Sequence, residues 1–86
     1  MFDIGVQIHT CASHLLTPPS VQLEACLVNF VIHEQHVRSM NPSNIEMTNK
    51  TVMPKNGYLE VSDEPGLGIE WSEKALSSKE QITFKL

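Results

Sequence analysis

The strongest constraint on the fold lies in residues 3–35, where two apolar runs that end in ionisable side chains flank a helical segment. The first run is followed by His9, and the second ends in Glu34, 25 positions later. A strand, a crossover helix and a second strand form a right-handed unit with parallel strands, so both strand ends open at the same edge of the sheet. Because α/β proteins carry out their chemistry at that edge, we predict that His9 and Glu34 lie side by side.

Alternation of side chains assigns the faces of the two strands. In the strand predicted for residues 3–8, isoleucine and valine alternate with other residue types, and His9 continues the second face. In the strand predicted for residues 29–34, Glu34 shares a face with two apolar residues, whereas His33 points the opposite way. Glu34 is therefore predicted to face the functional side and His33 the other.

The segment between the strands has the pattern of a helix. Thr17 is a candidate N-cap, and the two prolines after it suit the first turn of a helix, where a missing N–H costs nothing. We predict a helix at residues 18–28 that Asn29 closes. Its apolar residues cover most of its circumference, which predicts a helix packed against a sheet.

The remaining residues predict a loop, a hairpin and a short helix. Residues 39–44 contain Pro42 and are predicted to form a loop. The pair Asn56-Gly57 predicts a type I′ turn, because both residue types accept a positive φ. The turn predicted at residues 64–68 is followed by Ser72, a candidate N-cap of a short helix.

Five segments of the chain resemble the carboxyl-terminal end of enolase-superfamily enzymes, of the mandelate racemase and muconate lactonizing enzyme type. The nearest pattern is that of acid-sugar dehydratases such as galactonate dehydratase. The segments are Gly-Val-Gln-Ile-His-Thr-Cys-Ala-Ser-His at 5–14, Gln-Leu-Glu-Ala at 22–25, Asn-Phe-Val-Ile-His-Glu at 29–34, Asn-Gly-Tyr-Leu-Glu-Val at 56–61 and Pro-Gly-Leu-Gly at 65–68. The resemblance covers residues 3–76.

This resemblance implies an α/β fold in which the chain supplies the end of a (β/α)7β barrel of the TIM type. Residues 1–38 correspond to the last strand-helix-strand unit and residues 39–86 to a carboxyl-terminal arm. A barrel of this kind needs roughly 200 to 400 residues, so 86 residues form an incomplete barrel. Parallel sheets are buried on both faces, and we therefore expect the rest of the barrel, or self-association, to cover this one.

The resemblance also implies a reaction and three site residues. His9 matches the histidine that removes a proton next to the carboxylate of an acid sugar, and Glu34 matches the group that donates to that carboxylate as an enediolate forms. His36 is expected near the substrate. Water is then eliminated to give a 2-keto-3-deoxy acid. The family uses Mg²⁺, but its carboxylate ligands and the aspartate that orients the histidine lie outside this sequence.

Two noncatalytic alternatives remain open. The pairs Cys11-x-x-His14 and His33-x-x-His36 offer thiolate and imidazole, which suit tetrahedral zinc, although a helix separates them. A small zinc-binding module is one alternative, and a degenerate, truncated remnant of an enzyme is the other.

Composition excludes some classes of partner. The formal net charge is −4, with 6 basic residues against 10 acidic ones, so no basic surface for nucleic acid is expected. No apolar run approaches the roughly 20 residues that span a bilayer, and no secretion signal is recognisable. Two cysteines, Cys11 and Cys26, do not make a disulfide framework. We therefore expect a cytoplasmic protein that binds neither membrane nor nucleic acid.

Overall fold

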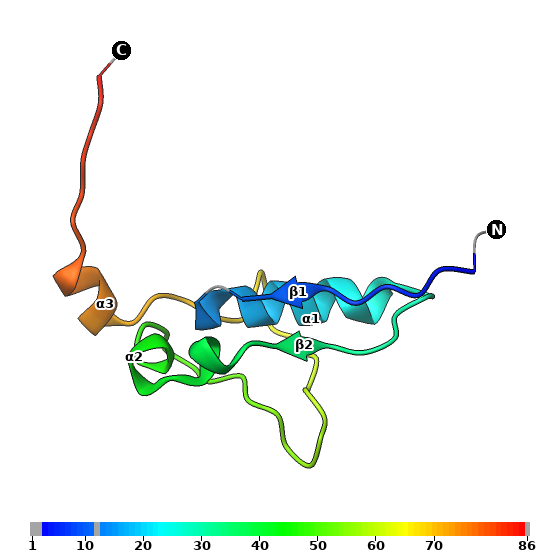
Figure 1. The fold of residues 1–86 in the computed structure, drawn as a ribbon. Coiled ribbons are helices and arrows are strands. Elements are labelled where there is room, and N and C mark those ends of the chain that lie inside the picture. Colours follow the sequence, from blue (N-terminus) through cyan, green and yellow to red (C-terminus); the bar gives the residue numbers. More distant parts are fainter. Residues whose placement is uncertain (1–2, 12, 86) are drawn as a thin grey trace.

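The computed structural model describes residues 3–11 and 13–85, and it contains one helix on one side of a short parallel strand pair, followed by an arm (Figure 1). No helix in these ranges is long and apolar enough to cross a membrane. In chain order the elements are β1 (His9–Thr10), η1 (His14–Leu16), α1 (Thr17–Cys26), β2 (Glu34–Gln35), η2 (Val37–Met40), α2 (Pro42–Ile45) and α3 (Glu73–Ser78), where η marks a 3-10 helix.

The predicted parallel pairing with a crossover helix is confirmed. β1 pairs with β2 in parallel, with His9 opposite Glu34, and an isolated parallel bridge joins Val6 to Phe30. The regular strands are two residues each and begin where the predicted strands end, so their predicted bounds are wrong: β1 follows residues 3–8, and β2 shares only Glu34 with residues 29–34. Each strand has only one neighbouring strand among the described residues. The hydrogen bonds of the bridge at Val6 are separated by a gap from those of the β1–β2 ladder. A two-stranded ribbon is marginal without further strands.

The boundaries of the crossover helix differ from the prediction at both ends. The 3-10 turn η1 leads directly into α1, so Thr17 is already helical and makes no capping bond, and the predicted N-cap is wrong. α1 ends at Cys26, because Leu27 is extended at φ −87° and ψ 120°. Asn29 does not close the helix. Its side chain donates to the carbonyl of Ile4 instead, at 2.9 Å.

The buried face of α1 is mostly polar, which the prediction of an apolar helix did not anticipate. Val21 and Pro18 are the buried apolar residues of the helix, and Thr17, Ser20 and Glu24 are buried beside them. Leu23, by contrast, is 55% exposed. The side of α1 toward the strands is therefore held by hydrogen bonds, and much of its apolar surface faces outward.

Residues 39–44, predicted as a loop, contain helical turns. Pro42 occupies the first turn of α2, where it loses no hydrogen bond, and η2 precedes it. The type I′ turn is confirmed, since Asn56 and Gly57 both have positive φ, 52° and 81°. The two residues flanking the turn exchange backbone bonds, but this single bridge is all that forms of the hairpin.

The arm returns along α1 and closes on itself. The side chain of Gln22 donates to the carbonyl of Ser62 at 2.6 Å, and Lys50 forms an ion pair with Glu64. Ser72 caps α3 as predicted, with its hydroxyl accepting from the N–H of Ala75 at 3.1 Å. In Figure 1 the residues after α3 extend away from the body of the molecule.

The molecule has a very small apolar core for its surface. Val21 and Ile69 are the buried large apolar residues of the described chain, whereas fifteen others are exposed. The accessible surface is 6961 Å², compared with about 5,100 Å² expected for a folded protein of 9.6 kDa. The radius of gyration is 15.2 Å, compared with about 12 Å for a compact chain of this length. Burial within the chain alone therefore gives little stability.

We predict that the isolated chain is marginally stable and associates or aggregates, because unpaired strand edges and apolar faces are open. Sedimentation velocity across a concentration series should show species larger than a monomer. A monomer with a single cooperative calorimetric transition would contradict the prediction.

His14 joins the two halves of the chain. Its imidazole is fully buried, and Nε2 accepts from the backbone N–H of Val52 at 2.8 Å. Nε2 must therefore lack a proton, which places the proton on Nδ1, where no hydrogen bond closes. Burial lowers the pKa of His14, and the nearby backbone of Ser39 opposes this only in part.

Lowering the pH is predicted to destabilise the chain through His14. Because the pKa is lower in the folded state, the unfolded chain binds the proton first, and the free energy of unfolding falls as the pH drops below about 6.5. The slope is at most about 1.4 kcal/mol per pH unit for one proton. The urea concentration at the midpoint of unfolding, measured by Trp71 fluorescence at several pH values, should fall as the pH is lowered. His14→Gln keeps an acceptor for Val52 and should flatten the slope, whereas His36→Gln should not. Equal slopes in His14→Gln and the parent would refute the assignment.

Candidate active site

The structure brings His9 and Glu34, the first residues of β1 and β2, into direct contact. His9 Nδ1 lies 2.6 Å from Glu34 Oε1. The other carboxylate oxygen accepts from the side-chain amide of Gln7 at 3.2 Å. The side chain of His9 is 66% exposed and that of Glu34 is 35% exposed, so the pair is open to solvent and to a substrate.

The parallel register is what places this pair. His9 is directly opposite Glu34, and the N–H of His36 continues the ladder to the carbonyl of Thr10 at 3.2 Å. Side chains directly opposite one another in a sheet point to the same face. The predicted juxtaposition therefore follows from pairing that the backbone itself makes.

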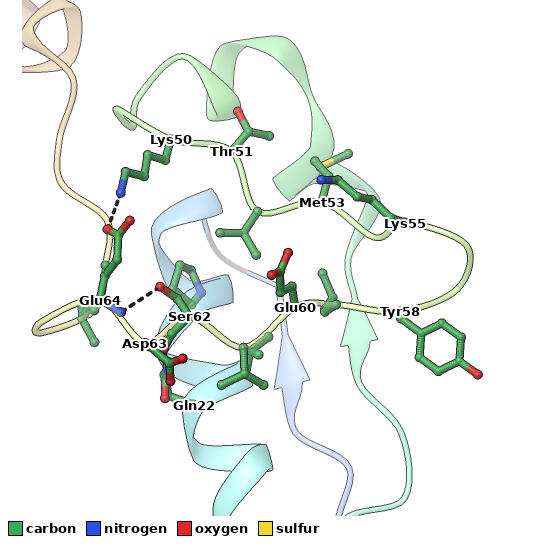
Figure 2. Close-up of a pocket in the computed structure, with 17 residues that line it drawn as sticks. Gln22, Lys50, Thr51, Met53, Lys55, Tyr58, Glu60, Ser62, Asp63 and Glu64 are labelled. Atoms are coloured by element: carbon green, nitrogen blue, oxygen red, sulfur yellow. Dashed lines mark hydrogen bonds and ion pairs between the residues drawn. The ribbon is translucent and has the colours of Figure 1, made fainter.

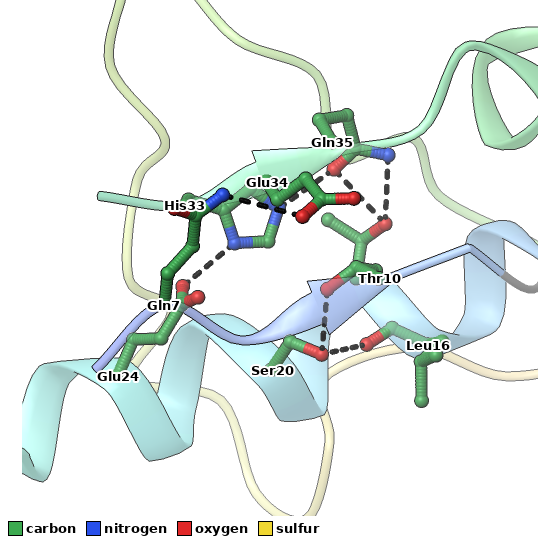
Figure 3. Close-up of polar contacts among 9 residues, drawn as sticks. Gln7, Thr10, Leu16, Ser20, Glu24, His33, Glu34 and Gln35 are labelled. Atoms are coloured by element: carbon green, nitrogen blue, oxygen red, sulfur yellow. Dashed lines mark hydrogen bonds and ion pairs between the residues drawn. The ribbon is translucent and has the colours of Figure 1, made fainter. Parts of the chain in front are cut away.

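The opposite face of the strands is tied to α1. His33 and Gln35 point away from Glu34, as the alternation predicted, and lie between β2 and the helix (Figure 3). On β1, Thr10 is fully buried and donates to Ser20, whose hydroxyl in turn donates to the carbonyl of Leu16. The rear of the site is thus a hydrogen-bonded layer.

His36 has a structural role in this chain. Its Nδ1 accepts from the N–H of Arg38 at 3.1 Å, which caps the 3-10 turn that follows β2. The predicted contact of His36 with substrate stays a prediction. The capping bond uses Nδ1 and leaves Nε2 for other contacts.

The zinc alternative is not supported by the arrangement of its four side chains. His14 is buried against Val52, and His33 lies against Glu24. His36 caps η2, and Cys11 is exposed. Throughout residues 3–11 and 13–85, no group of three or more His, Cys, Asp or Glu side chains is placed to hold a metal ion.

A sizeable pocket lies away from His9 and Glu34. It has a volume of 670 Å³ and lies between α1 and the arm, where Lys50 and Glu64 form their ion pair (Figure 2). Neither His9 nor Glu34 lines it. Proximity of ionisable groups, and not the size of a cavity, therefore identifies the candidate site.

Two side chains of the site were not singled out from the sequence. Gln7 lies two residues before His9 and therefore on the same face of an extended strand, a spacing that could have identified it. Glu24 gave no such signal, because its partner His33 is nine residues away on another element and only the packing of α1 brings them together.

The comparisons with known proteins point to one family. The family model described as enolase C-terminal domain-like matches residues 1–75. A comparison with curated proteins gives no match. Among solved structures, a member of the enolase superfamily from Salmonella Typhimurium is 36% identical with a TM-score of 0.86, over 94% of this chain and 21% of that one. A "putative dehydratase protein" from Salmonella enterica serovar Typhimurium is 33% identical with a TM-score of 0.80, over 85% of this chain and 18% of that one.

Proposed function

The chain belongs to the enolase C-terminal domain-like family, and on that premise we propose that it forms the end of the barrel of a magnesium-dependent acid-sugar dehydratase of the mandelate racemase type. It spans about a fifth of the length of the two structures it matches, 21% and 18%. The remaining barrel would cover its exposed apolar residues and complete the site. We propose a cytoplasmic enzyme, in keeping with the two free cysteines.

The observation that carries this proposal is the contact between His9 and Glu34. A distance of 2.6 Å between an imidazole nitrogen and a carboxylate oxygen requires a proton between them, because two lone pairs would repel. The two groups therefore share one proton in a hydrogen bond, at the edge of the sheet where α/β barrels place their chemistry. The similarity to a protein described as a dehydratase supports the reaction class.

In the proposed reaction, His9 takes the proton from the carbon next to the substrate carboxylate. Glu34, in its protonated form, donates a hydrogen bond to the substrate carboxylate as negative charge develops there, where a positioned donor gives most to the rate. The carbon–oxygen bond at the next carbon then breaks. The protonated His9 returns its proton to the hydroxyl, which leaves as water, and the enol that remains tautomerises to a 2-keto-3-deoxy acid. The substrate must separate His9 from Glu34 before the first step.

Magnesium does not fit the residues that the structure describes. The carboxylate of Glu34 is occupied by His9 and Gln7, and no cluster of three ligand side chains forms in those ranges. Hard cations of this kind take several oxygen ligands. In the proposed enzyme the ligands would belong to other parts of the barrel, and His9 and Glu34 would act beside the metal.

The 86-residue chain alone is predicted to be inactive, because residues 3–11 and 13–85 contain no metal site and the pair His9 and Glu34 is open to water. Galactonate and mannonate, incubated with the chain and Mg²⁺, should give no keto acid above a control without protein. Formation of keto acid would show that the chain needs no further sequence for catalysis.

The roles of His9 and Glu34 can be tested in a chimera in which this chain replaces the matching end of the Salmonella Typhimurium enolase-superfamily protein. His9→Asn and Glu34→Gln keep polarity and size but remove the ionisable groups. Each should lower kcat by at least about a hundredfold, the scale of a positioned acid, base or oxyanion donor.

The matched control is Glu46→Gln, which removes an exposed carboxylate paired with Lys74 and should leave kcat within about threefold.

Exchange of the substrate's carbon-2 hydrogen with solvent deuterium separates the role of His9 from that of Glu34. His9→Asn should abolish it. A folded chimera that binds acid sugars but shows neither exchange nor dehydration would favour the noncatalytic remnant.

A further inference from the structure

The side-chain amide of Gln35 has one orientation in the buried network behind β2. The hydroxyl of Ser39 donates its single proton to the carbonyl of His36 at 2.6 Å, so it can only accept from Gln35. The group of Gln35 that faces Ser39 must therefore be the NH2 group, which also donates to Thr17 at 3.2 Å. Its carbonyl oxygen Oε1 then faces His33.

That orientation fixes the protons of His33. Nε2 lies 2.9 Å from Gln35 Oε1, a pure acceptor, so Nε2 carries a proton and donates it. Nδ1 lies 2.7 Å from Glu24 Oε2. A carboxylate oxygen and a bare ring nitrogen would repel at this distance, so a second proton lies between them. Glu24 and His33 thus share one proton in a buried contact (Figure 3).

The shared proton is the main stabilisation of the Glu24 carboxyl group. The residue is 5% exposed, and its second oxygen, Oε1, is buried without a hydrogen-bond partner in the described part of the chain. A buried carboxyl group without partners is costly. His33 is nearly as buried, with 11% of its side chain exposed. Each member of the pair therefore holds the other in place, and together they fasten β2 to α1.

We infer that Glu24 and His33 are positioning residues for Glu34, an inference that rests on the proposed function for its catalytic meaning. Glu34 stands between His33, which directly precedes β2, and Gln35, and both neighbours are bound on the rear face, to Glu24 and to Thr17 respectively. The residues on either side of Glu34 are thereby fixed. The carboxylate is left projecting from the front face toward His9, with one backbone position and one side-chain direction.

The test uses NMR spectroscopy of the chimera that carries this chain, in which the rest of the barrel would cover the open strand edges, with three substitutions. In the parent chimera the His33 ring should be protonated at Nε2, and scalar couplings should report a single Glu34 rotamer. Glu24→Ala removes the partner of Nδ1. The Glu34 side chain should then sample several rotamers, seen as averaged couplings. The hydrogen-exchange rate of the His36 amide, which bonds to the carbonyl of Thr10, should rise about tenfold, the effect of one lost hydrogen bond.

Rescue by a conservative substitution separates positioning from simple packing. Glu24→Gln offers an amide N–H to Nδ1, so it should keep the Nε2 proton and restore the single Glu34 rotamer to the parent pattern. Glu46→Gln, at an exposed ion pair, should change neither readout. A mere packing role would leave the rotamer of Glu34 unchanged in Glu24→Ala.

Three results would overturn the inference. The first is a His33 ring in the parent that lacks a proton at Nε2 or has the chemical shifts of a free histidine. The second is a Glu34 rotamer that is the same in Glu24→Ala as in the parent, and the third is a Glu24→Gln variant that behaves like Glu24→Ala. None of these readouts involves dehydration. Loss of the NMR pattern therefore refutes positioning, whereas an inactive chimera with the pattern intact refutes only the proposed function.

Discussion

The parallel register of β1 and β2 is the interaction on which the rest of the structure depends. Because His9 lies opposite Glu34, one backbone pairing sets both the position of the site and the face on which it opens. The neighbours of this pair turn to the other face, where Thr10 is fully buried and His33 and Gln35 are half-buried, and they are tied to α1. The pairing is short, and polar contacts behind it, rather than an apolar core, hold it in place.

Hydrogen bonds dominate because the chain buries little apolar surface of its own. Thr10, Thr17, Ser39 and His14 are fully buried, and these four polar side chains take positions that larger apolar residues hold in most small proteins. Such groups are satisfied by partners from distant segments, as His14 is by Val52. The arrangement is in keeping with the proposed barrel, whose other strands and helices would supply further apolar contacts.

Local sequence signals predicted those features that depend on neighbouring residues. The type I′ turn at Asn56-Gly57 and the Ser72 cap follow from the conformational needs of two or three residues, and both are confirmed. The contact of His9 with Glu34 was predicted as well, because the right-handed crossover leaves one arrangement of the strand ends. The predicted ends of α1 were wrong. At the start of the helix, Thr17 bonds to Gln35 instead of capping it. The partnership of Glu24 with His33 was outside the reach of any local pattern.

His9 is proposed to take the proton from carbon 2 of the substrate while Glu34 binds the substrate carboxylate, and a crystal structure of the chimera with an unreactive acid-sugar analogue tests this most directly. The predicted result places a ring nitrogen of His9 within about 3.5 Å of carbon 2 and Glu34 within hydrogen-bond distance of the carboxylate. An analogue bound at the barrel with His9 and Glu34 still in contact with each other, and with neither touching it, would contradict the account.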